Sequence, residues 1–402
     1  MSRDALDRLR IQQSLELAEN AIGVSEPNPR VGCVIGTDDG RVLGTGSTQQ
    51  AGGAHAEIMA LRDAAHAGYS LSGATAWVTL EPCAHHGRTP PCCEAFIAHG
   101  LARVVVALQD PFAAVCGQGI ARLRAAGIQV DAAARDLAAV AWDLNIGFFS
   151  RVLRQRPWVR LKIAATLDGR TSLDNGVSQW ITGEAARADV HAWRRRASAV
   201  MTGIGTVLAD DPHLDVRLVP SVLQPMRVIV DSKLRLPLSS RLLAAPGQVV
   251  VASADRDGEK LAALRAAGVE ILHLPQSAST GALPAVDLPD LLSALNERDV
   301  NELHVEAGPR LNAGLLAADL VDELLIYLAP SIVGPGQGMV SWPGLQALPS
   351  ASAWAFTSTA SVGRDLRLRL LKSNPVFGYG MVGLPMSVSF TASPPPDSRG
   401  LI

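Results

Sequence analysis

Basic charge is in short supply in this chain, because 36 Lys and Arg residues face 38 Asp and Glu residues and leave a formal net charge of −2. Nucleic-acid-binding proteins usually carry a basic surplus, so this balance argues against a nucleic-acid partner. Long apolar runs are also missing. No stretch approaches the roughly 20 apolar residues of a membrane span. The first residues, Met1–Asp4, begin a segment of scattered charges without the apolar core of a signal peptide. We therefore expect no membrane partner and no export signal.

Cysteine is scarce as well, with five residues in 402. A small, odd number of cysteines does not indicate a disulfide framework and fits a reducing compartment, so we expect a cytoplasmic protein. Hydrophobic residues make up 48% of the chain and charged residues 18%. That composition can fill real cores, and the length predicts two or three domains.

Alternating helical and strand patterns run from the N-terminus to about residue 146. They predict an α/β domain whose sheet is sandwiched by helices. The expected helices are 5–20, 55–67, 92–99, 117–126 and 135–145, and the expected strands are 31–36, 41–46, 75–80 and 103–108. A second domain begins with a strand at Trp158–Ala164 and ends with the strict apolar alternation of Asp365–Leu370.

Three arginines, Arg151, Arg154 and Arg156, lie between these two domains and are interpreted as part of a solvated linker at 146–157. Residues 373–402 are rich in Pro, Gly and Ser and predict a disordered tail. We place the boundaries at 1–149, 150–372 and 373–402.

The most informative motif is His55-Ala56-Glu57, followed by Pro82-Cys83 and Pro91-Cys92. One imidazole and two thiolates favour zinc, and three protein ligands leave a fourth position for water. The metal lowers the pKa of that water towards ~7, which makes hydroxide available at neutral pH. Glu57 would not bind the metal but would move the proton from water to departing ammonia. These are the parts of a hydrolytic zinc deaminase holding one zinc per chain.

The spacing of the two cysteines narrows this prediction. Nucleic-acid and nucleoside deaminases carry Pro-Cys-x-x-Cys, whereas residues 84–91 separate Cys83 from Cys92 here. Arg88 in this loop could contact a phosphorylated small molecule, although a solvated loop is the plainer interpretation. Cys93 adjoins Cys92, but its side chain would point about a hundred degrees away on a helix, so we assign it to the core.

Three segments resemble the bacterial bifunctional riboflavin-biosynthesis deaminase/reductase family: Pro27–Gly32, His55–Glu57 and Leu80–Cys92. The resemblance continues to about residue 372. It implies an N-terminal cytidine-deaminase-like three-layer α/β/α domain and a C-terminal dihydrofolate-reductase-like α/β domain. It also implies two consecutive reactions. A diamino-pyrimidinone phosphoribosylamine first loses its C2 amino group, and NADPH then reduces the ribosyl chain to ribityl phosphate.

The resemblance also implies the residues of the second site. Those that resemble the family's substrate contacts are Ser178, Arg194, Leu214, Arg217 and Glu306. Those that resemble its NADPH contacts are Ala164, Trp180, Thr206, Asp210, Ser232, Gly308, Pro309, Arg310, Leu311, Asn312, Ala313 and Gly314. Lys162, Asn28 and Arg88 are further candidates. Lys162 and Asp210 could polarise the sugar carbonyl and relay a proton.

Physical arguments support part of this assignment. Leu303–Glu306 predicts a strand, and Arg310–Ala318 predicts a helix whose N-terminal amides could hold a pyrophosphate. An ordinary strand-to-helix turn is the alternative. Gly203-Ile204-Gly205 is half of a Rossmann fingerprint, but Leu208 replaces the third glycine, so a Rossmann fold is rejected. Ser232, Lys233 and Arg235 follow a strand and could bind a 2′-phosphate.

Several departures from the family pattern keep alternatives open. Thr48 replaces a usual histidine near the deaminase substrate, Ala307 replaces a glycine, and Phe112-Ala113 replaces Asn-Pro. Thr48 leaves room for a reductase whose deaminase domain is only a scaffold. A nucleic-acid deaminase and a non-enzymatic zinc module are less favoured alternatives. The expected partners are a small phosphorylated pyrimidine and further copies of the chain, as a dimer or tetramer.

Overall fold

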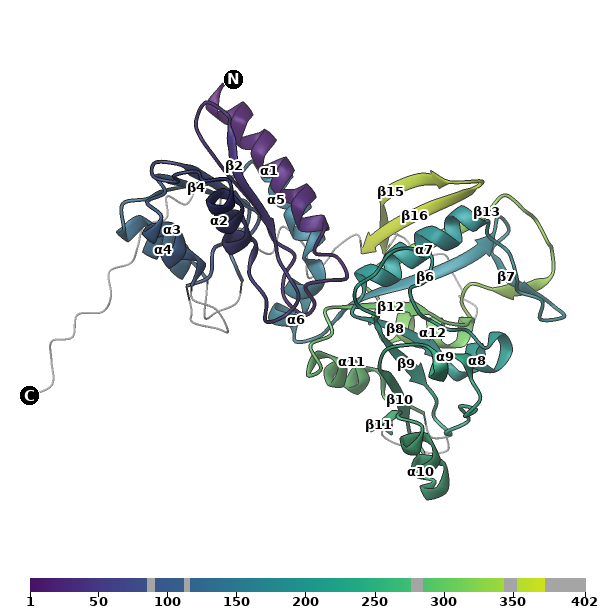
Figure 1. The fold of residues 1–402 in the computed structure, drawn as a ribbon. Helices are drawn as coiled ribbons and strands as arrows, with labels where there is room; N and C mark the ends of the chain where they lie inside the picture. The colour runs from purple at the N-terminus through teal and green to yellow at the C-terminus, as the bar shows by residue number, and fades with distance from the viewer. Residues whose placement is uncertain (85–90, 112–115, 276–284, 343–352, 373–402) are drawn as a thin grey trace, which may run out of the picture. The chain divides into compact units, whose positions relative to one another are not determined.

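The computed structural model describes all residues except 85–90, 112–115, 276–284, 343–352 and 373–402. The predicted tail and Phe112-Ala113 therefore lie outside the described residues. The described chain divides into two compact units (Figure 1). Among the described residues, the first contains Met1–Ala21 and Pro29–Asn145, and the second contains Ile22–Asn28 and residues 146–372. This division differs from the sequence boundary at 149/150 chiefly by the transfer of Ile22–Asn28 to the second unit. Among the described residues, no helix has the length and apolar character needed to cross a membrane.

The first unit is built on a five-stranded sheet with the strand order β2-β1-β3-β4-β5. Its strands are β1 (Gly32–Gly36), β2 (Val42–Ser47), β3 (Thr75–Val78), β4 (Arg103–Val106) and β5 (Gln129–Ala132). Its helices are α1 (Arg3–Glu19), α2 (Ala56–His66), α3 (Cys92–Ala98), α4 (Gln118–Ala125) and α5 (Arg135–Leu144). Strand β1 pairs antiparallel with β2 and β3, and β3, β4 and β5 are parallel. The short, polar strand β5 is absent from the sequence prediction.

Helices cover both faces of this sheet, and glycines allow them to approach closely. A Cβ on Gly32 would lie 1.9 Å from the carbonyl oxygen of Ser14 in α1. A Cβ on Gly46 would lie 2.2 Å from that of Ala56 in α2. Because Gly32 and Gly46 point to opposite faces of the paired strands, α1 and α2 lie on opposite sides of the sheet. The expected three-layer α/β/α architecture is confirmed.

The segment expected to be a solvated linker is instead helix α6 (Ile146–Arg154), which buries Ile146 and Phe149. Its arginines are bound to the second unit. Arg151 donates to Asp299 Oδ1 at 2.8 Å, Arg154 donates to Asp322 Oδ1 at 2.9 Å, and Arg156 also pairs with Asp322. The linker interpretation was wrong because three basic residues in sequence do not reveal acidic partners that lie far along the chain.

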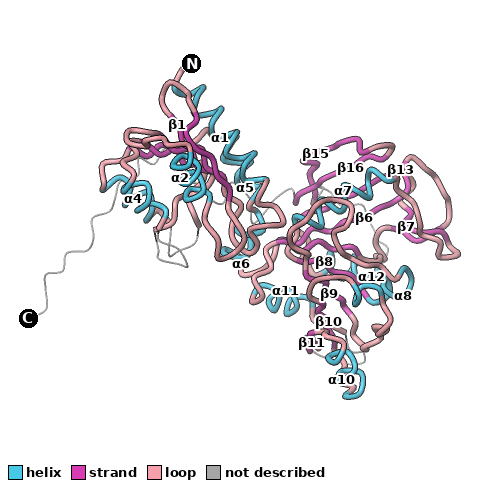
Figure 2. Tube along the Cα trace, in the orientation of Figure 1, coloured by secondary structure: helices cyan, strands magenta, loops and turns pink. Residues whose placement is uncertain are grey.

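The second unit is built on a nine-stranded sheet with the order β11-β10-β9-β8-β12-β6-β13-β16-β15 (Figure 2). Its strands are β6 (Trp158–Thr166), β8 (Ala199–Gly203), β9 (Met226–Val230), β10 (Val249–Ser253), β11 (Glu270–His273), β12 (Glu302–Glu306), β13 (Glu323–Ala329), β15 (Trp354–Val362) and β16 (Asp365–Lys372). A separate pair joins β7 (Arg170–Leu173) to β14 (Gly336–Gly338). Its other helices are α7 (Glu184–Arg196), α8 (Ile204–Asp210), α9 (Arg241–Ala244), α10 (Gly258–Ala266), α11 (Leu288–Asn296) and α12 (Pro309–Ala317).

The strands from β11 to β13 are parallel, and β16 and β15 extend the sheet antiparallel. This mixed sheet agrees with the implied dihydrofolate-reductase-like fold and with the rejection of a Rossmann fold. The two faces differ in chemistry. Val159 and Leu161 of β6 pack in an apolar core with residues of α11 and α12.

On the opposite face, Arg160 of β6 is fully buried and pairs with Glu302 at 2.7 Å and Glu323 at 3.0 Å. Its guanidinium lies over the ring of Trp193 in α7, 4.5 Å from the ring centroid. Charged side chains therefore line the sheet beneath α7.

We call Ile22–Asn28 the strap, because this short segment of the N-terminal region docks on the second unit. Glu26 Oε2 accepts hydrogen bonds from Ser198 Oγ at 2.7 Å and from Asn301 Nδ2 at 2.8 Å. Asn301 Nδ2 also donates to the carbonyl oxygen of Pro27 at 2.9 Å. The sequence analysis assigned the strap to the deaminase domain and did not anticipate these contacts.

Candidate functional sites

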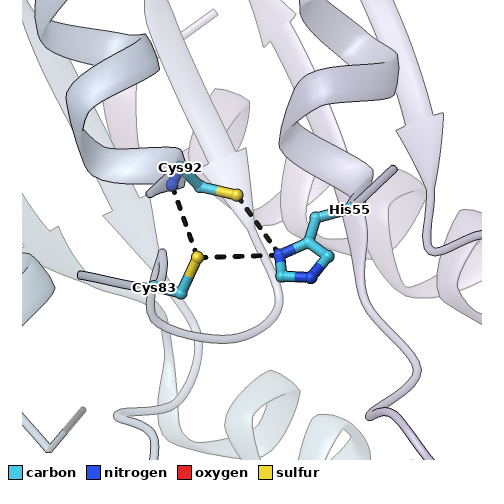
Figure 3. A group of neighbouring side chains, drawn as sticks. All are labelled: His55, Cys83 and Cys92. Carbon is cyan, nitrogen blue, oxygen red and sulfur yellow. Dashed lines mark hydrogen bonds between the residues drawn. The ribbon is translucent and has the colours of Figure 1, made fainter. Parts of the chain in front are cut away.

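The three predicted zinc ligands come together in the first unit (Figure 3). His55 is the N-cap residue of α2, Cys83 lies in the loop that follows β3, and Cys92 is the first residue of α3. His55 Nδ1 lies 3.6 Å from Cys83 Sγ and 3.4 Å from Cys92 Sγ. The backbone amide of Cys92 donates to Cys83 Sγ at 3.4 Å. The two helix N-termini and the loop thus aim one nitrogen and two sulfurs at a common point.

These atoms fit a zinc ion. A tetrahedral zinc with ordinary bond lengths holds an imidazole nitrogen and a thiolate sulfur about 3.5 Å apart, which is the spacing of the His55 and cysteine atoms here. All three ligand atoms lie within 4.8 Å of one another. Two sulfurs and one imidazole are also the donor types that zinc prefers. Cys93 is buried with the core, as expected, and burial raises the pKa of its thiol to about 11.

The three ligand side chains shift one another's pKa values. Hydrogen bonding from Cys92 lowers the pKa of Cys83 to about 4, and the contact with Cys83 raises the pKa of His55 to about 9. The pKa of Cys92 is raised by its contact with the Cys83 sulfur and by burial. Zinc binds the thiolate form of a cysteine and the neutral form of an imidazole, so its affinity for these three side chains depends on pH.

Glu57 lies beside this cluster at the start of α2, with only 3% of its surface exposed. Burial raises its pKa to about 7, and the nearby charge of Cys83 adds to this, although His55 acts in the opposite direction. A carboxyl group with a pKa near neutrality can both accept and release a proton at physiological pH. The position and burial of Glu57 thus suit the acid/base task predicted from the motif.

The other residues considered for the deaminase site are Arg88, Asn28 and Thr48. Arg88 lies outside the described residues. Asn28 belongs to the strap of the second unit. Thr48 is buried, and its hydroxyl lies 3.2 Å from the amide of Val31, from which it accepts a hydrogen bond. The residue that replaces the family's histidine therefore ties β2 to β1.

The second candidate site follows the carboxyl ends of the parallel strands in the second unit. Strands β9, β8, β12 and β6 are neighbours, and their carboxyl ends meet at one edge of the sheet. Ligands of open α/β sheets bind at such edges. Ser232 follows β9, Thr206 follows β8, Glu306 ends β12, and Ala164 lies near the end of β6. Topology thus gathers residues that are far apart in the sequence.

Glu306 is the centre of a charged cluster at this edge. Arg194 of α7 binds it with two parallel contacts, one of them 3.0 Å from Nη2 to Oε2, and Lys162 Nζ lies 3.7 Å from Oε2. Burial alone would raise the pKa of Glu306, but Arg194 and Lys162 hold it well below its usual range. Burial lowers the pKa of Lys162, whereas Glu306 opposes that shift. Arg194, Lys162 and Glu306, which were all predicted from the sequence, therefore form one ion-pair cluster.

The sequence analysis missed His304, which lies on the same face of β12 as Glu306. His304 is fully buried, and its Nε2 lies 3.5 Å from Glu306 Oε1. Neither ring nitrogen has a hydrogen-bond partner among the described residues. A histidine two positions before an acidic strand end is too common a pattern to mark a site.

Arg217 and Leu214 lie in the loop after α8. Arg217 pairs with Asp215, whose carbonyl oxygen accepts from Arg194 Nη1 at 2.9 Å, and the amide of Arg217 donates to His191 Nδ1. The side chain of Leu214 is buried, and its backbone has φ 56°. Such a left-handed leucine is a strained conformation of the kind found at functional sites.

The segment predicted to hold a pyrophosphate begins helix α12. Gly308 is the N-cap of α12, and Pro309 occupies the first turn. Among the described residues, a Cβ on Gly308 would have only Thr206 Oγ1 within 4 Å, at 3.7 Å, which leaves room for a ligand to approach this backbone closely. The remaining predicted residues of this segment, Arg310, Leu311, Asn312, Ala313 and Gly314, follow in the helix. The open N-terminus and its amides fit a dinucleotide phosphate.

Ser178, Trp180 and Asn312, which are also predicted site residues, have defined side-chain contacts. Ser178 Oγ donates to Asp210 Oδ1 at 3.1 Å, which joins a predicted substrate residue to a predicted cofactor residue. Trp180 is 65% exposed and lies under the guanidinium of Arg187, 4.6 Å from it. Asn312 Nδ2 donates to the carbonyl oxygen of Met339. The ring of Trp180 is thus available for contact with a ligand.

Asp231 explains the shape of the segment that carries Ser232, Lys233 and Arg235. Its fully buried carboxylate accepts from the amides of Arg235 at 2.5 Å and Leu236 at 2.8 Å. Asp231 therefore cannot play the ribose-binding part that an acid at a Rossmann strand end plays. It fixes the turn instead. Because β9 lies two strands from β12, this turn is about 10 Å along the edge from Glu306.

Comparisons with known proteins agree with this two-site arrangement. Residues 6–108 match the family model of the cytidine and deoxycytidylate deaminase zinc-binding region, and residues 157–368 match that of the RibD C-terminal domain. The riboflavin biosynthesis protein RibD of Escherichia coli (strain K12) is 41% identical over 382 residues, which cover 91% of this chain and 99% of that protein. RibD of Aquifex aeolicus is 40% identical over 331 residues, covering 82% and 89%. The solved structure of Acinetobacter baumannii RibD, form 1, is 38% identical with a TM-score of 0.82, and it covers 92% of this chain and 100% of that one.

Proposed function

Because this chain belongs to the bifunctional riboflavin-biosynthesis deaminase/reductase family, we propose that its two units catalyse consecutive steps on one pyrimidine intermediate. The first unit hydrolyses the C2 amino group of a 2,5-diamino-pyrimidinone phosphoribosylamine. The second reduces the ribosyl side chain of the deaminated product to ribityl phosphate. The observation that carries the first activity is the convergence of His55, Cys83 and Cys92 beside the buried Glu57.

In the first unit, His55, Cys83 and Cys92 would hold zinc. Bound zinc acidifies water and polarises the reacting carbon-nitrogen system. Glu57 accepts the proton of the attacking water and later delivers it to the departing amino group, which leaves as ammonia. The raised pKa of Glu57 allows both transfers near neutral pH. Burial around Glu57 keeps bulk water from competing for that proton.

In the second unit, Gly308 and the first turn of α12 would hold the cofactor phosphates, with Thr206 and Asp210 beside them. NADPH supplies the hydride. Arg194 and Arg217 present cations to the substrate phosphate, and Glu306 keeps Arg194 oriented by a two-point contact. The side chain of Lys162 is 16% exposed and lies next to Glu306, where it can polarise the sugar carbonyl and donate a proton to its oxygen.

We also propose that 1–149 supplies the deaminase and 150–372 the reductase, except that the strap serves the second. The chain would act in the cytoplasm as a dimer or tetramer, with a small phosphorylated pyrimidine as its partner. The balanced charge and the five cysteines support this proposal. Membership of a family of biosynthetic enzymes, whose substrates diffuse freely, also supports the proposed small-molecule partner.

A reductase with a scaffold deaminase unit is the second candidate, and Thr48 is the residue that favours it. Its hydroxyl is used within the sheet, so it cannot replace a histidine side chain towards a substrate. The intact metal-binding geometry and the buried Glu57 favour the bifunctional enzyme, because neither is needed for scaffolding.

One experiment separates the two candidates. The purified full chain is incubated with the diamino intermediate, with and without NADPH, and products are identified by mass spectrometry. The bifunctional enzyme forms the deaminated product and ammonia without NADPH and forms the ribityl product only when NADPH is added. A scaffold protein leaves the diamino form unchanged but reduces a deaminated intermediate supplied separately.

A further inference from the structure

Glu81 lies two residues before the zinc ligand Cys83, and its carboxylate is buried, with 3% of the residue exposed. Both oxygens accept hydrogen bonds from backbone amides. Oε1 accepts from Gly119 at 2.9 Å and Ile120 at 3.2 Å, and Oε2 accepts from Gly117 at 3.0 Å and Asp110 at 3.2 Å. Four amides of a distant segment thus converge on one carboxylate beside the metal cluster.

The bonds to Gly119 and Ile120 replace a missing helix cap. Helix α4 begins after Gly117, which has φ 74° and no side chain with which to cap the helix. Gly119 and Ile120 are its second and third residues, whose amides an N-cap side chain normally binds. Glu81 supplies that acceptor from another part of the chain, and its negative charge suits a helix N-terminus.

The same contact fixes the turn that carries Cys83. A Cβ on Gly119 would lie 1.9 Å from the carbonyl oxygen of Pro82, so the first turn of α4 packs directly on the backbone before the ligand. The amide of Glu81 donates to the carbonyl oxygen of Leu108 at 2.8 Å. The carbonyl oxygen of Cys83 accepts from the amide of Cys93 in α3. The backbone of residues 81–83 is therefore held by the segment that follows β4, by α4 and by α3.

We propose that Glu81 is a positioning residue of the deaminase, which sets the direction of the Cys83 thiolate by anchoring residues 81–83 to the start of α4. It does not touch the metal or the reacting atoms. This inference rests on the zinc centre of the proposed function. The effect is transmitted because Cys83 can reach the common point of the three ligands only while the backbone at Pro82 stays against Gly119.

The main test is Glu81→Gln in the full chain. Glutamine keeps the volume of the side chain and one acceptor oxygen. Its side-chain NH₂ group, however, would face two backbone N–H groups that need an acceptor. We expect zinc affinity, measured by competition with a chromogenic chelator, to fall about 10- to 100-fold, the usual effect of losing an outer partner of a metal ligand. The absorption spectrum of the Co²⁺-loaded variant should also differ from that of the wild type, because cobalt bands report ligand geometry.

Glu94→Gln is the matched control. Glu94 is also two residues from a zinc ligand and also reaches α4, through a 3.0 Å ion pair with Arg122, but both side chains are about half exposed. We expect its zinc affinity and cobalt spectrum to match the wild type. NADPH oxidation with the deaminated substrate should be normal in both variants. Wild-type zinc affinity and spectrum in Glu81→Gln would overturn the proposal, whereas a wild type that binds no zinc would overturn the proposed function itself.

A second measurement needs no variant and decides the matter if Glu81→Gln does not fold. If residues 81–83 link the metal to α4, the coupling is reciprocal. Bound zinc should then slow hydrogen exchange of the amides at 117–120, just as their hydrogen bonds to Glu81 strengthen zinc binding. Hydrogen exchange of the wild-type chain, followed by mass spectrometry, should slow in the peptide that covers 117–120 when zinc is added to metal-free protein. Unchanged exchange there, with slower exchange at 55–61, would contradict the proposal.

Discussion

The zinc centre and the reductase edge are built in opposite ways. His55, Glu57, Cys83 and Cys92 occur within one short part of the chain, whereas the reductase residues extend from Lys162 to Gly314 and meet only because parallel strands end at one edge. The first site is defined by rare side chains, and the second by topology. A site of the first kind can be found from residue types and spacing, but one of the second kind needs the strand order.

The buried carboxylates of the two sites also differ. Burial raises the pKa of Glu57 to about 7, and the negative charge of Cys83 adds to this shift while His55 opposes it. The side chain of Glu306 is 13% exposed, and Arg194 and Lys162 hold its pKa well below its usual range. Glu57 is therefore suited to exchange protons, and Glu306 is suited to remain an anion that orients cations. The same residue type has opposite tasks because its neighbours differ in charge.

The sharpest way to separate the two sites is to remove a zinc ligand. Cys83→Ser or Cys92→Ser should abolish zinc binding and ammonia release together, because three protein ligands are needed. NADPH oxidation with the deaminated substrate should continue. Metal content by mass spectrometry and both rates are measured on the same preparation. Cys93→Ser is the control, and loss of zinc in that variant would show that the ligand assignment is wrong.

Glu57→Gln should give the next largest effect. The amide keeps the size of the side chain but cannot accept a proton, so ammonia release should fall by roughly 10²-fold or more. Zinc content and the reductase rate should stay at wild-type values. An unchanged rate of ammonia release would remove Glu57 from the mechanism.

The next prediction concerns whether the strap, a segment of the N-terminal region, stabilises the second unit. Glu26→Ala removes the acceptor of Ser198 and Asn301, which should lower the free energy of unfolding of the second unit by roughly 1–3 kcal/mol. The melting temperature of the second unit is measured as the temperature at which heating removes half of the reductase activity. Glu19→Ala, at the exposed end of α1, is the control. Equal melting of both variants and the wild type would show that the strap does not stabilise this unit.

The last prediction concerns the choice of cofactor. If Ser232, Lys233 and Arg235 bind the 2′-phosphate, NADPH should be preferred over NADH by about tenfold or more, from roughly 1.5–3 kcal/mol per charge-assisted bond. Replacing all three residues by Ala should remove most of the preference and leave the NADH rate nearly intact. Equal loss with both cofactors would mean that the segment only supports the fold.

The sequence predicted the zinc ligands, Glu57 and most elements of the first unit, because period-two and helical patterns are local. It also placed Pro309 correctly at the start of a helix. It missed β5, whose short polar strand has no apolar pattern, and it took α6 for a linker because Asp299 and Asp322 are remote. The positioning contacts of Glu81 and Asp231 were also missed. Their partners are backbone amides, which every residue carries and no sequence pattern marks.

The strap has a consequence for the time course of synthesis. Asn301 lies 275 residues after Glu26 along the chain. At about 5–20 residues per second, the ribosome needs roughly 14 to 55 s to make the partner of a side chain that has already emerged. The strap must wait, without its final contacts, while the surrounding deaminase segments can already fold. The reductase unit is thus completed last, by a segment that was among the first to leave the ribosome.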